Sequence, residues 1–216
     1  MTKNSVLVHG YNKNKKDMYV LSKNLEKLNH KCIVVDLPLT YKEIDYAYSV
    51  FEKSIEGILK DLRGGEKINL IGHSTGGLII RKLLLNTKFI DQVNNCVLIA
   101  TPNNGSELAD LAARYFGFLT DAYKTLKSLR TEYVKSIEFI KGDKVRVGAI
   151  AGNRNNLLMG KFLKDQNDGR INVNSVFHKG LNDFIILPYG HKEIHYKWKT
   201  AKLADNFIEK GRFIES

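Results

Sequence analysis

A G-x-S-x-G pattern at residues 72–76, set between a predicted strand and a predicted helix, constrains this chain more than any other feature. The strand is indicated by the apolar residues that precede it, Ile68, Leu70 and Ile71. The helix is indicated by the apolar residues that follow, Leu78, Ile79, Ile80, Leu83 and Leu84. In this setting the pattern predicts a nucleophile elbow, a strained turn that exposes the hydroxyl of Ser74 above the edge of a sheet. Gly72 and Gly76 flank the serine because a side chain there would collide with the neighbouring strand or helix.

A glycine-rich turn between a strand and a helix can also bind phosphate groups. Neither G-x-x-x-x-G-K-[ST] nor G-x-G-x-x-G is present at this turn. The pattern therefore favours a nucleophilic serine. The helix that begins at Thr75 would direct its free N–H groups toward the reacting centre, where negative charge develops.

Apolar runs alternate with helical patterns along the rest of the chain. Strands are predicted at residues 5–11, 31–36, 67–72, 93–100, 144–151 and 183–187. Helices are predicted at 14–29, at 46–62, after residue 75, over 106–141 with breaks near Gly117 and Gly142, and around 198–208. Residues 153–170 predict a long polar loop. Because the strands are apolar on both faces, they predict an α/β fold, a parallel sheet covered by helices on both sides. We expect the 216 residues to form one domain, 1–216.

The formal net charge of +11 raises the question of a nucleic-acid or membrane partner. The lysines are scattered, and their densest groups are Lys13, Lys15 and Lys16 near one end and Lys192, Lys197, Lys199 and Lys202 near the other. No group has the aromatic interleaving of a nucleic-acid module, so we expect no nucleic-acid partner. A solvated basic surface is the favoured interpretation, with at most a weak attraction to anionic lipid head groups. No membrane-spanning run and no signal peptide are recognisable, which favours a cytoplasmic protein.

A serine hydroxyl needs a base, a group that orients the base, and donors for the oxyanion. In an open parallel sheet these groups must lie beyond the carboxyl ends of the strands. The residues predicted to lie there are His9, Gly10, Tyr11, Asp36, Ser74, Thr101, the carboxylates of 165–168, and His191.

Several stretches resemble the motifs of α/β-hydrolases of the small lipase and esterase branch. They are Val6-Leu-Val-His-Gly-Tyr11, Gly72-His-Ser-Thr-Gly-Gly77, Thr101-Pro-Asn-Asn-Gly-Ser106, Asp168-Gly-Arg-Ile-Asn-Val173 and Gly190-His191. They span nearly the whole chain, and their order of Ser, Asp and His is that of this fold.

The resemblance implies a compact, mostly parallel six-stranded sheet and a serine hydrolase. Ser74 would be the nucleophile, Asp168 the acid and His191 the base. The backbone N–H groups of Tyr11 and Thr75 would form the oxyanion hole. Residues 104–142 correspond to a helical, lid-like segment that lies over the active site and lines the acyl pocket. The family's strand order places two strands between Cys32 and Cys96, too far apart for a disulfide, so both are expected to be buried thiols.

Each assigned residue has a rival. His195, four residues after His191, is the alternative base, and Asp165 and then Asp183 are the alternative acids. His9 is expected to brace the oxyanion loop, and His73 to pack beside the sheet. His191 and His195 flank Glu193 without an H-E-x-x-H order or an evident third ligand, so we expect no metal and no cofactor.

The predicted activity is cleavage of carboxylic esters, of small-molecule or lipid type, through an acyl-enzyme on Ser74. A thioesterase or acyltransferase would use the same triad. A catalytically silent ligand- or partner-binding protein is the alternative from another class, although no triad residue is missing. The sequence defines neither the acyl-chain length nor the oligomeric state.

Overall fold

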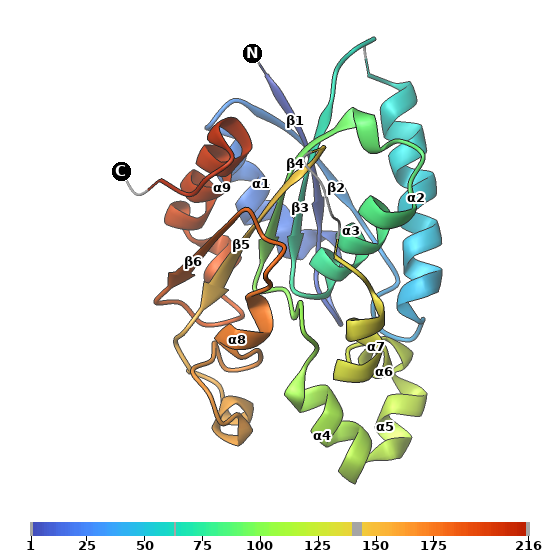
Figure 1. Ribbon diagram of the computed structural model, residues 1–216, viewed down its shortest axis with the longest axis vertical. Coiled ribbons are helices and arrows are strands. Elements are labelled where there is room, and N and C mark those ends of the chain that lie inside the picture. Colours follow the sequence, from blue (N-terminus) through green and yellow to red (C-terminus); the bar gives the residue numbers. More distant parts are fainter. Residues whose placement is uncertain (1, 63, 140–143, 215–216) are drawn as a thin grey trace.

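The computed structural model describes residues 2–62, 64–139 and 144–214, and six strands in it form one parallel sheet (Figure 1). The strands are β1 (Lys3–Val8), β2 (His30–Val35), β3 (Ile68–His73), β4 (Val93–Ile99), β5 (Arg146–Gly152) and β6 (Asp183–Leu187). Their order across the sheet is β2-β1-β3-β4-β5-β6, and every neighbouring pair is parallel. The predicted six-stranded parallel sheet is therefore confirmed. The elbow follows β3, in the interior of the sheet.

Helices cover both faces of the sheet (Figure 1). One face carries α1 (Tyr19–Glu26) and α9 (Trp198–Lys210), which pack against each other and against the strands. The other face carries α2 (Ile44–Lys60) and α3 (Thr75–Asn86). The buried apolar side chains accordingly divide into two clusters, one on each side of the sheet. Strands with two covered faces explain why their sequences are continuous apolar runs.

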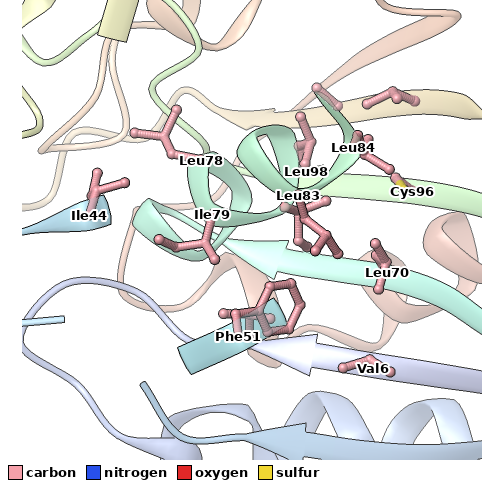
Figure 2. Close-up of a cluster of buried hydrophobic side chains, with 14 of the residues drawn as sticks. Val6, Ile44, Phe51, Leu70, Leu78, Ile79, Leu83, Leu84, Cys96 and Leu98 are labelled. Carbon is pink, nitrogen blue, oxygen red and sulfur yellow. The ribbon is translucent and has the colours of Figure 1, made fainter. Parts of the chain in front are cut away.

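The cluster on the α2 and α3 face holds α3, and therefore the elbow, against the sheet. Figure 2 shows Phe51 of α2, Leu83 of α3 and Leu70 of β3 converging, and all three are fully buried. Burying a side chain of this size contributes roughly 1.5–3 kcal/mol. The start of α3 is thus fixed by packing along its whole buried face.

The segment after β4 differs in detail from the prediction. Residues 106–141 were expected to be helical with breaks near Gly117 and Gly142; the structure has four short helices, α4 (Glu107–Tyr115), α5 (Gly117–Ala122), α6 (Lys124–Lys127) and α7 (Thr131–Ser136). The break at Phe116 agrees with the prediction, whereas those around Tyr123 and residues 128–130 were not predicted. Gly142 lies outside the described residues. The N-cap of α4 is Ser106, whose hydroxyl accepts a hydrogen bond from the Ala109 N–H.

The connection from β5 to β6 is less polar than expected. It contains a 3₁₀ turn, η3 (Leu158–Phe162), and the short helix α8 (Val173–Val176). Leu158, Met159 and Phe162 on the turn are exposed. Three further 3₁₀ turns are η1 (Lys15–Met18), η2 (Ile90–Gln92) and η4 (Ile194–Tyr196).

Both cysteines are free thiols; Cys96 is buried as expected, whereas Cys32 is only partly buried. Cys32 lies on β2 and Cys96 on β4, with β1 and β3 between them. Burial raises the pKa of the Cys32 thiol to about 11. Among the helices that the structure describes, none is long and apolar enough to cross a membrane.

Candidate active site

Ser74 occupies a strained turn between β3 and α3. Its backbone has φ 53° and ψ −123°, a conformation that side-chain-bearing residues rarely adopt. Two backbone hydrogen bonds hold it, from the Ser74 N–H to the Ile99 carbonyl at 2.8 Å and from the Gly77 N–H to the Ser74 carbonyl at 3.0 Å. Strain of this kind costs on the order of 1–3 kcal/mol and persists only where the surroundings enforce it. The side chain of Ser74 is directed by this turn to the carboxyl edge of the sheet.

The two glycines of the pattern are required by close backbone contacts. A Cβ on Gly76 would lie 2.5 Å from the carbonyl oxygens of both Val8 and His9, at the end of β1. A Cβ on Gly72 would lie 2.6 Å from the Gly77 nitrogen, in the first turn of α3. The turn can therefore approach the neighbouring strand and helix only because both positions lack a side chain.

Ser74, His191 and Asp168 form a continuous chain of hydrogen bonds. His191 Nε2 lies 3.1 Å from Ser74 Oγ, and His191 Nδ1 lies 2.7 Å from Asp168 Oδ2. The three residues are 117 and 23 positions apart along the chain, and all three are buried. This is the hydroxyl, imidazole and carboxylate arrangement that activates a serine.

Asp168 fixes which nitrogen of His191 carries the proton. Its Oδ1 accepts hydrogen bonds from the N–H groups of Arg170 at 3.0 Å and Ile171 at 2.8 Å. Because Oδ1 is occupied by two backbone donors, Oδ2 is the oxygen that accepts from His191 Nδ1–H, which leaves Nε2 free to accept the serine proton. A backbone hydrogen bond from the His191 N–H to the Asp168 carbonyl, 2.8 Å long, ties the two loops together.

The two residues whose backbone N–H groups were expected to form the oxyanion hole both lie next to Ser74. Thr75 is the first residue of α3, and Tyr11 lines the cavity beside Ser74. Within the described residues neither N–H donates a hydrogen bond to another group. His9 braces the Tyr11 loop: its Nδ1–H donates to the Gly10 carbonyl at 2.9 Å, and its Nε2 accepts from the Leu37 N–H at 3.0 Å.

The rival residues occupy other places. Asp165 is exposed, and Asp183 begins β6, at the amino end of that strand. His195 lies on η4 and is buried with its Nε2 3.2 Å from Asp17 Oδ2. None of the three joins the hydrogen-bond chain of Ser74.

A second buried group of ionisable side chains lies behind His191. The His195 ring stacks on the His73 ring with centroids 3.8 Å apart, and His73 Nε2–H donates to the His191 carbonyl at 3.1 Å. Burial lowers the pKa of both His73 and His195. Burial raises the pKa of Asp17, but hydrogen bonds from His195 and Tyr196 outweigh it, so that the pKa lies below its usual range.

Asp17, His73 and His195 also form a set of metal-capable donors, with ligand atoms within 4.8 Å of one another. Of the pair considered from the sequence, His191 and His195, only His195 belongs to this set, and neither Asp17 nor His73 was expected as a ligand. The two rings are stacked with 22° between their planes. Lone pairs in nearly parallel, stacked planes do not converge on one ion, so this arrangement favours ring packing over ligation.

An apolar cavity of about 290 Å³ opens beside Ser74. The helical segment contributes most of its wall, and His191 and Arg170 lie at its polar end. The apolar and aromatic lining residues are Leu108, Ala109, Ala112, Tyr123, Leu126, Leu129, Met159 and Ile171. Larger recesses on the outside of α7 have no lining residue in common with the Ser74 site.

Exposed apolar side chains flank this cavity on two sides. One group is on α4 and α5 and the other on η3, and Figure 1 shows both segments beyond the carboxyl ends of the strands, η3 as the orange turn. The residues, each more than half exposed, are Tyr115, Phe116 and Phe118 in the first group and Leu158, Met159 and Phe162 in the second.

Comparison with known proteins agrees with this fold. The profile of the family described as alpha/beta hydrolase fold matches residues 6–133, more than half of the chain. The protein therefore belongs to the α/β-hydrolase fold family. The predicted resemblance is confirmed at the level of family and fold.

Individual relatives are lipases and esterases by name. Lipase 1 of Staphylococcus aureus is 29% identical over 91 residues, a match that spans 31% of this chain and only 13% of that lipase. The mature lipase of Bacillus licheniformis has a TM-score of 0.79 at 19% identity, covering 96% of this chain and 91% of that one. A metagenomic carboxyl esterase has a TM-score of 0.73 at 15% identity, covering 97% and 76%. Likeness at these identities shows the fold.

Proposed function

We propose that this protein is a serine hydrolase that cleaves carboxylic esters through an acyl-enzyme on Ser74. The observation that carries the proposal is the hydrogen-bond chain from Ser74 Oγ through His191 to Asp168, with distances of 3.1 and 2.7 Å, beside an apolar cavity. The family membership and the lipases and esterases among its relatives support the same activity.

In the first half of the reaction Ser74 Oγ attacks the ester carbonyl while His191 Nε2 takes its proton. The carbonyl oxygen becomes an oxyanion, which the N–H groups of Tyr11 and Thr75 stabilise at the positive end of α3. The ester C–O bond then breaks, and His191 Nε2–H gives its proton to the departing alcohol. The acyl group remains on Ser74 as an ester.

In the second half a water molecule donates its proton to His191 Nε2 and attacks the acyl carbon. The bond between the acyl carbon and Ser74 Oγ breaks, Oγ recovers the proton, and the carboxylic acid leaves. Asp168 accepts the His191 Nδ1–H bond throughout and stabilises the imidazolium that forms in each half.

The acyl chain is assigned to the 290 Å³ cavity, because most of the residues that line it are apolar. We propose that the segment expected from the sequence to be lid-like, 104–142, forms a wall of this cavity through its described part, 104–139; residues 140–142 lie outside the described part of the chain. A cavity of this size suits a short or medium acyl chain.

The exposed apolar groups on α4, α5 and η3 favour esters presented at a lipid surface. Because the chain is strongly basic, we propose that these exposed apolar groups contact an anionic lipid surface. Co-flotation with phosphatidylglycerol vesicles, and weaker co-flotation with phosphatidylcholine vesicles, is the expected result.

A fluorophosphonate probe tests the proposed function directly. We expect covalent labelling of Ser74 and hydrolysis of p-nitrophenyl butyrate, with both lost in Ser74→Ala; the turnover should fall by about 10⁴-fold or more. Ser49→Ala, an exposed serine of α2, is the matched control and should keep both. Failure of the folded protein to label would instead support a silent binding protein, and a preference for the butyryl thioester over the oxygen ester would support a thioesterase.

A further inference from the structure

A second, polar recess meets the apolar cavity at Ser74. This cleft is small and is lined by residues of the Tyr11 loop, the elbow, Arg170 and the His191 turn. Tyr11, Ser74, Arg170 and His191 line both recesses. The cleft measures only about 20 Å³, so an ester held at Ser74 with its acyl half in the apolar cavity would direct its alcohol half toward the cleft and its rim.

The cleft is rich in cations. Lys13, Arg170 and Lys192 line it, whereas its one carboxylate is that of Asp17. Asp17 is already engaged by the Tyr196 hydroxyl at 2.6 Å and by the Lys13 ammonium at 3.2 Å. Lys13 is thus paired with Asp17, whereas Arg170 and Lys192 have no carboxylate partner among the described residues.

Arg170 is the most informative of the three cations. Its backbone is fixed by the hydrogen bond from its N–H to Asp168, and its side chain is only half exposed. Within the described residues its guanidinium has no hydrogen-bonded or ionic partner. Its charge acts on the Tyr11 phenol, where it opposes the rise in pKa that burial causes, so the guanidinium lies near the oxyanion loop.

A guanidinium that lines a cleft with all five N–H donors unused by the protein is available to bind a ligand. Phosphate and carboxylate groups match its planar fork with two parallel hydrogen bonds. Lys192, exposed beside His191, adds a second positive charge at the mouth of the cleft.

We propose that the preferred substrate is an ester whose alcohol half carries an anionic group, a phosphate or a carboxylate, bound by Arg170 with help from Lys192. This inference rests on the proposed esterase function and adds the substrate class to it. In the acylation step the alcohol oxygen leaves with the proton from His191 Nε2, and the anionic group departs unchanged. The anion is assigned to the alcohol half because the acyl cavity is apolar, and an unpaired charge there would lose its hydration.

Turnover of butyrate esters whose alcohol halves carry different charges tests this selectivity. The series is butyrylcholine, glycerol 1-butyrate, 1-butyrylglycerol 3-phosphate and 4-butyryloxybutanoate. We expect kcat/KM for at least one of the two anionic esters to exceed that for glycerol 1-butyrate by about tenfold or more, and the cationic ester to be the poorest. Arg170→Gln should bring the anionic-to-neutral ratio close to one, and Arg170→Lys should restore part of it.

Lys31→Gln is the matched control, because Lys31 is an exposed lysine near the amino end of β2, at the opposite end of the strands from Ser74. It should keep the ratio of the unmodified protein. Where Arg170→Gln does not give a folded protein by circular dichroism, Lys192→Gln carries the test and should lower the ratio several-fold. Equal kcat/KM for neutral and anionic esters, or a ratio unaffected by the variants at Arg170 and Lys192, overturns the inference.

Binding separates this inference from the proposed function. In Ser74→Ala, calorimetry should detect sn-glycerol 3-phosphate but not glycerol, and Arg170→Gln in the same background should weaken binding by about tenfold. Inorganic phosphate is the third probe, and tighter binding of it than of glycerol 3-phosphate assigns the site to the free anion. Anion binding through Arg170 without any ester turnover would support the proposed anion site and refute the proposed esterase function. If the protein neither binds the anions nor prefers anionic esters, the anion site at Arg170 is refuted and the proposed esterase function is unaffected.

Discussion

Asp168→Asn is the most discriminating single change, because it alters the proton on His191 and almost nothing else. The carboxylate accepts two backbone N–H groups on Oδ1 and His191 Nδ1–H on Oδ2. Asparagine has one acceptor oxygen, and the N–H groups of Arg170 and Ile171 will take it. Its NH₂ group then points at His191 Nδ1 and forces the proton onto Nε2.

A His191 with its proton on Nε2 cannot accept the proton of Ser74, although the ring stays in place. We expect kcat to fall by about 10⁴-fold, which is a rise of roughly 5.5 kcal/mol in the barrier. The free energy of unfolding should fall far less, by about 1–3 kcal/mol, because the two backbone donors remain satisfied.

The assay is hydrolysis of p-nitrophenyl butyrate, with urea unfolding followed by circular dichroism on the same samples. Asp165→Asn is the control: Asp165 is exposed, so its variant should keep full activity and a free energy of unfolding within about 0.5 kcal/mol. An Asp168→Asn enzyme within tenfold of the unmodified protein, or an equally large loss in Asp165→Asn, would refute the assignment of the acid.

Three further outcomes follow from the packing and charge of the site. Gly76→Ala places a Cβ 2.5 Å from two carbonyl oxygens and should destabilise the fold by about 3 kcal/mol or more. Gly57→Ala, where a Cβ on α2 meets open space, should instead stabilise the fold by about 0.5–1 kcal/mol in the same urea titration. Equal effects of the two substitutions would contradict the steric argument. Burial holds the pKa values of His73 and His195 below those of the unfolded chain, so the unfolded state binds more protons below about pH 6.5. The free energy of unfolding should therefore fall as the pH drops from about 7.5 to 5.5, by up to about 1.4 kcal/mol per pH unit for each histidine. His195→Gln should reduce this dependence on pH, and an identical free energy of unfolding at both pH values would contradict the argument. Ala112→Phe should fill part of the acyl cavity and lower kcat/KM for octanoate relative to acetate p-nitrophenyl esters by about tenfold, and an unchanged chain-length profile would remove the cavity from the acyl site.

The Asp17, His73 and His195 group yields one more measurement. Since its rings are stacked, ester turnover should be unchanged after dialysis against EDTA. Loss of activity that zinc restores would show that the three side chains hold an ion.

The elbow and the sheet were predictable from the sequence because their signals are local. A buried strand, three glycines within six residues and an apolar helix lie next to one another, so sterics alone relate them. Parallel strands with two covered faces likewise leave continuous apolar runs. Ser74 could therefore be proposed as nucleophile from a stretch of 11 residues, 67–77.

The aspartate and histidine that accompany Ser74 were harder to predict from the sequence, because they lie far from it along the chain. The sequence ranked Asp168 over Asp165 and His191 over His195 by resemblance, and residue spacing alone could not separate them. The structure separates them by position: Asp168 and His191 approach Ser74, while His195 turns toward Asp17, 178 residues away in sequence. Asp17 belongs to no recognisable sequence motif, and only its contacts in the structure show that it lies beside His73 and His195.

Arg170 illustrates the same limit. The sequence shows it as one of 34 basic residues, two positions after Asp168. Its half-burial at the junction of an apolar cavity and a cationic cleft depends on loops from both halves of the chain. What the sequence by itself determined were the elements and the candidate nucleophile, since backbone sterics and apolar periodicity act over short separations. Which side chains meet at the carboxyl edge, and with what charge, was decided only by tertiary packing, because that packing brings together groups whose separation in sequence carries no distance information.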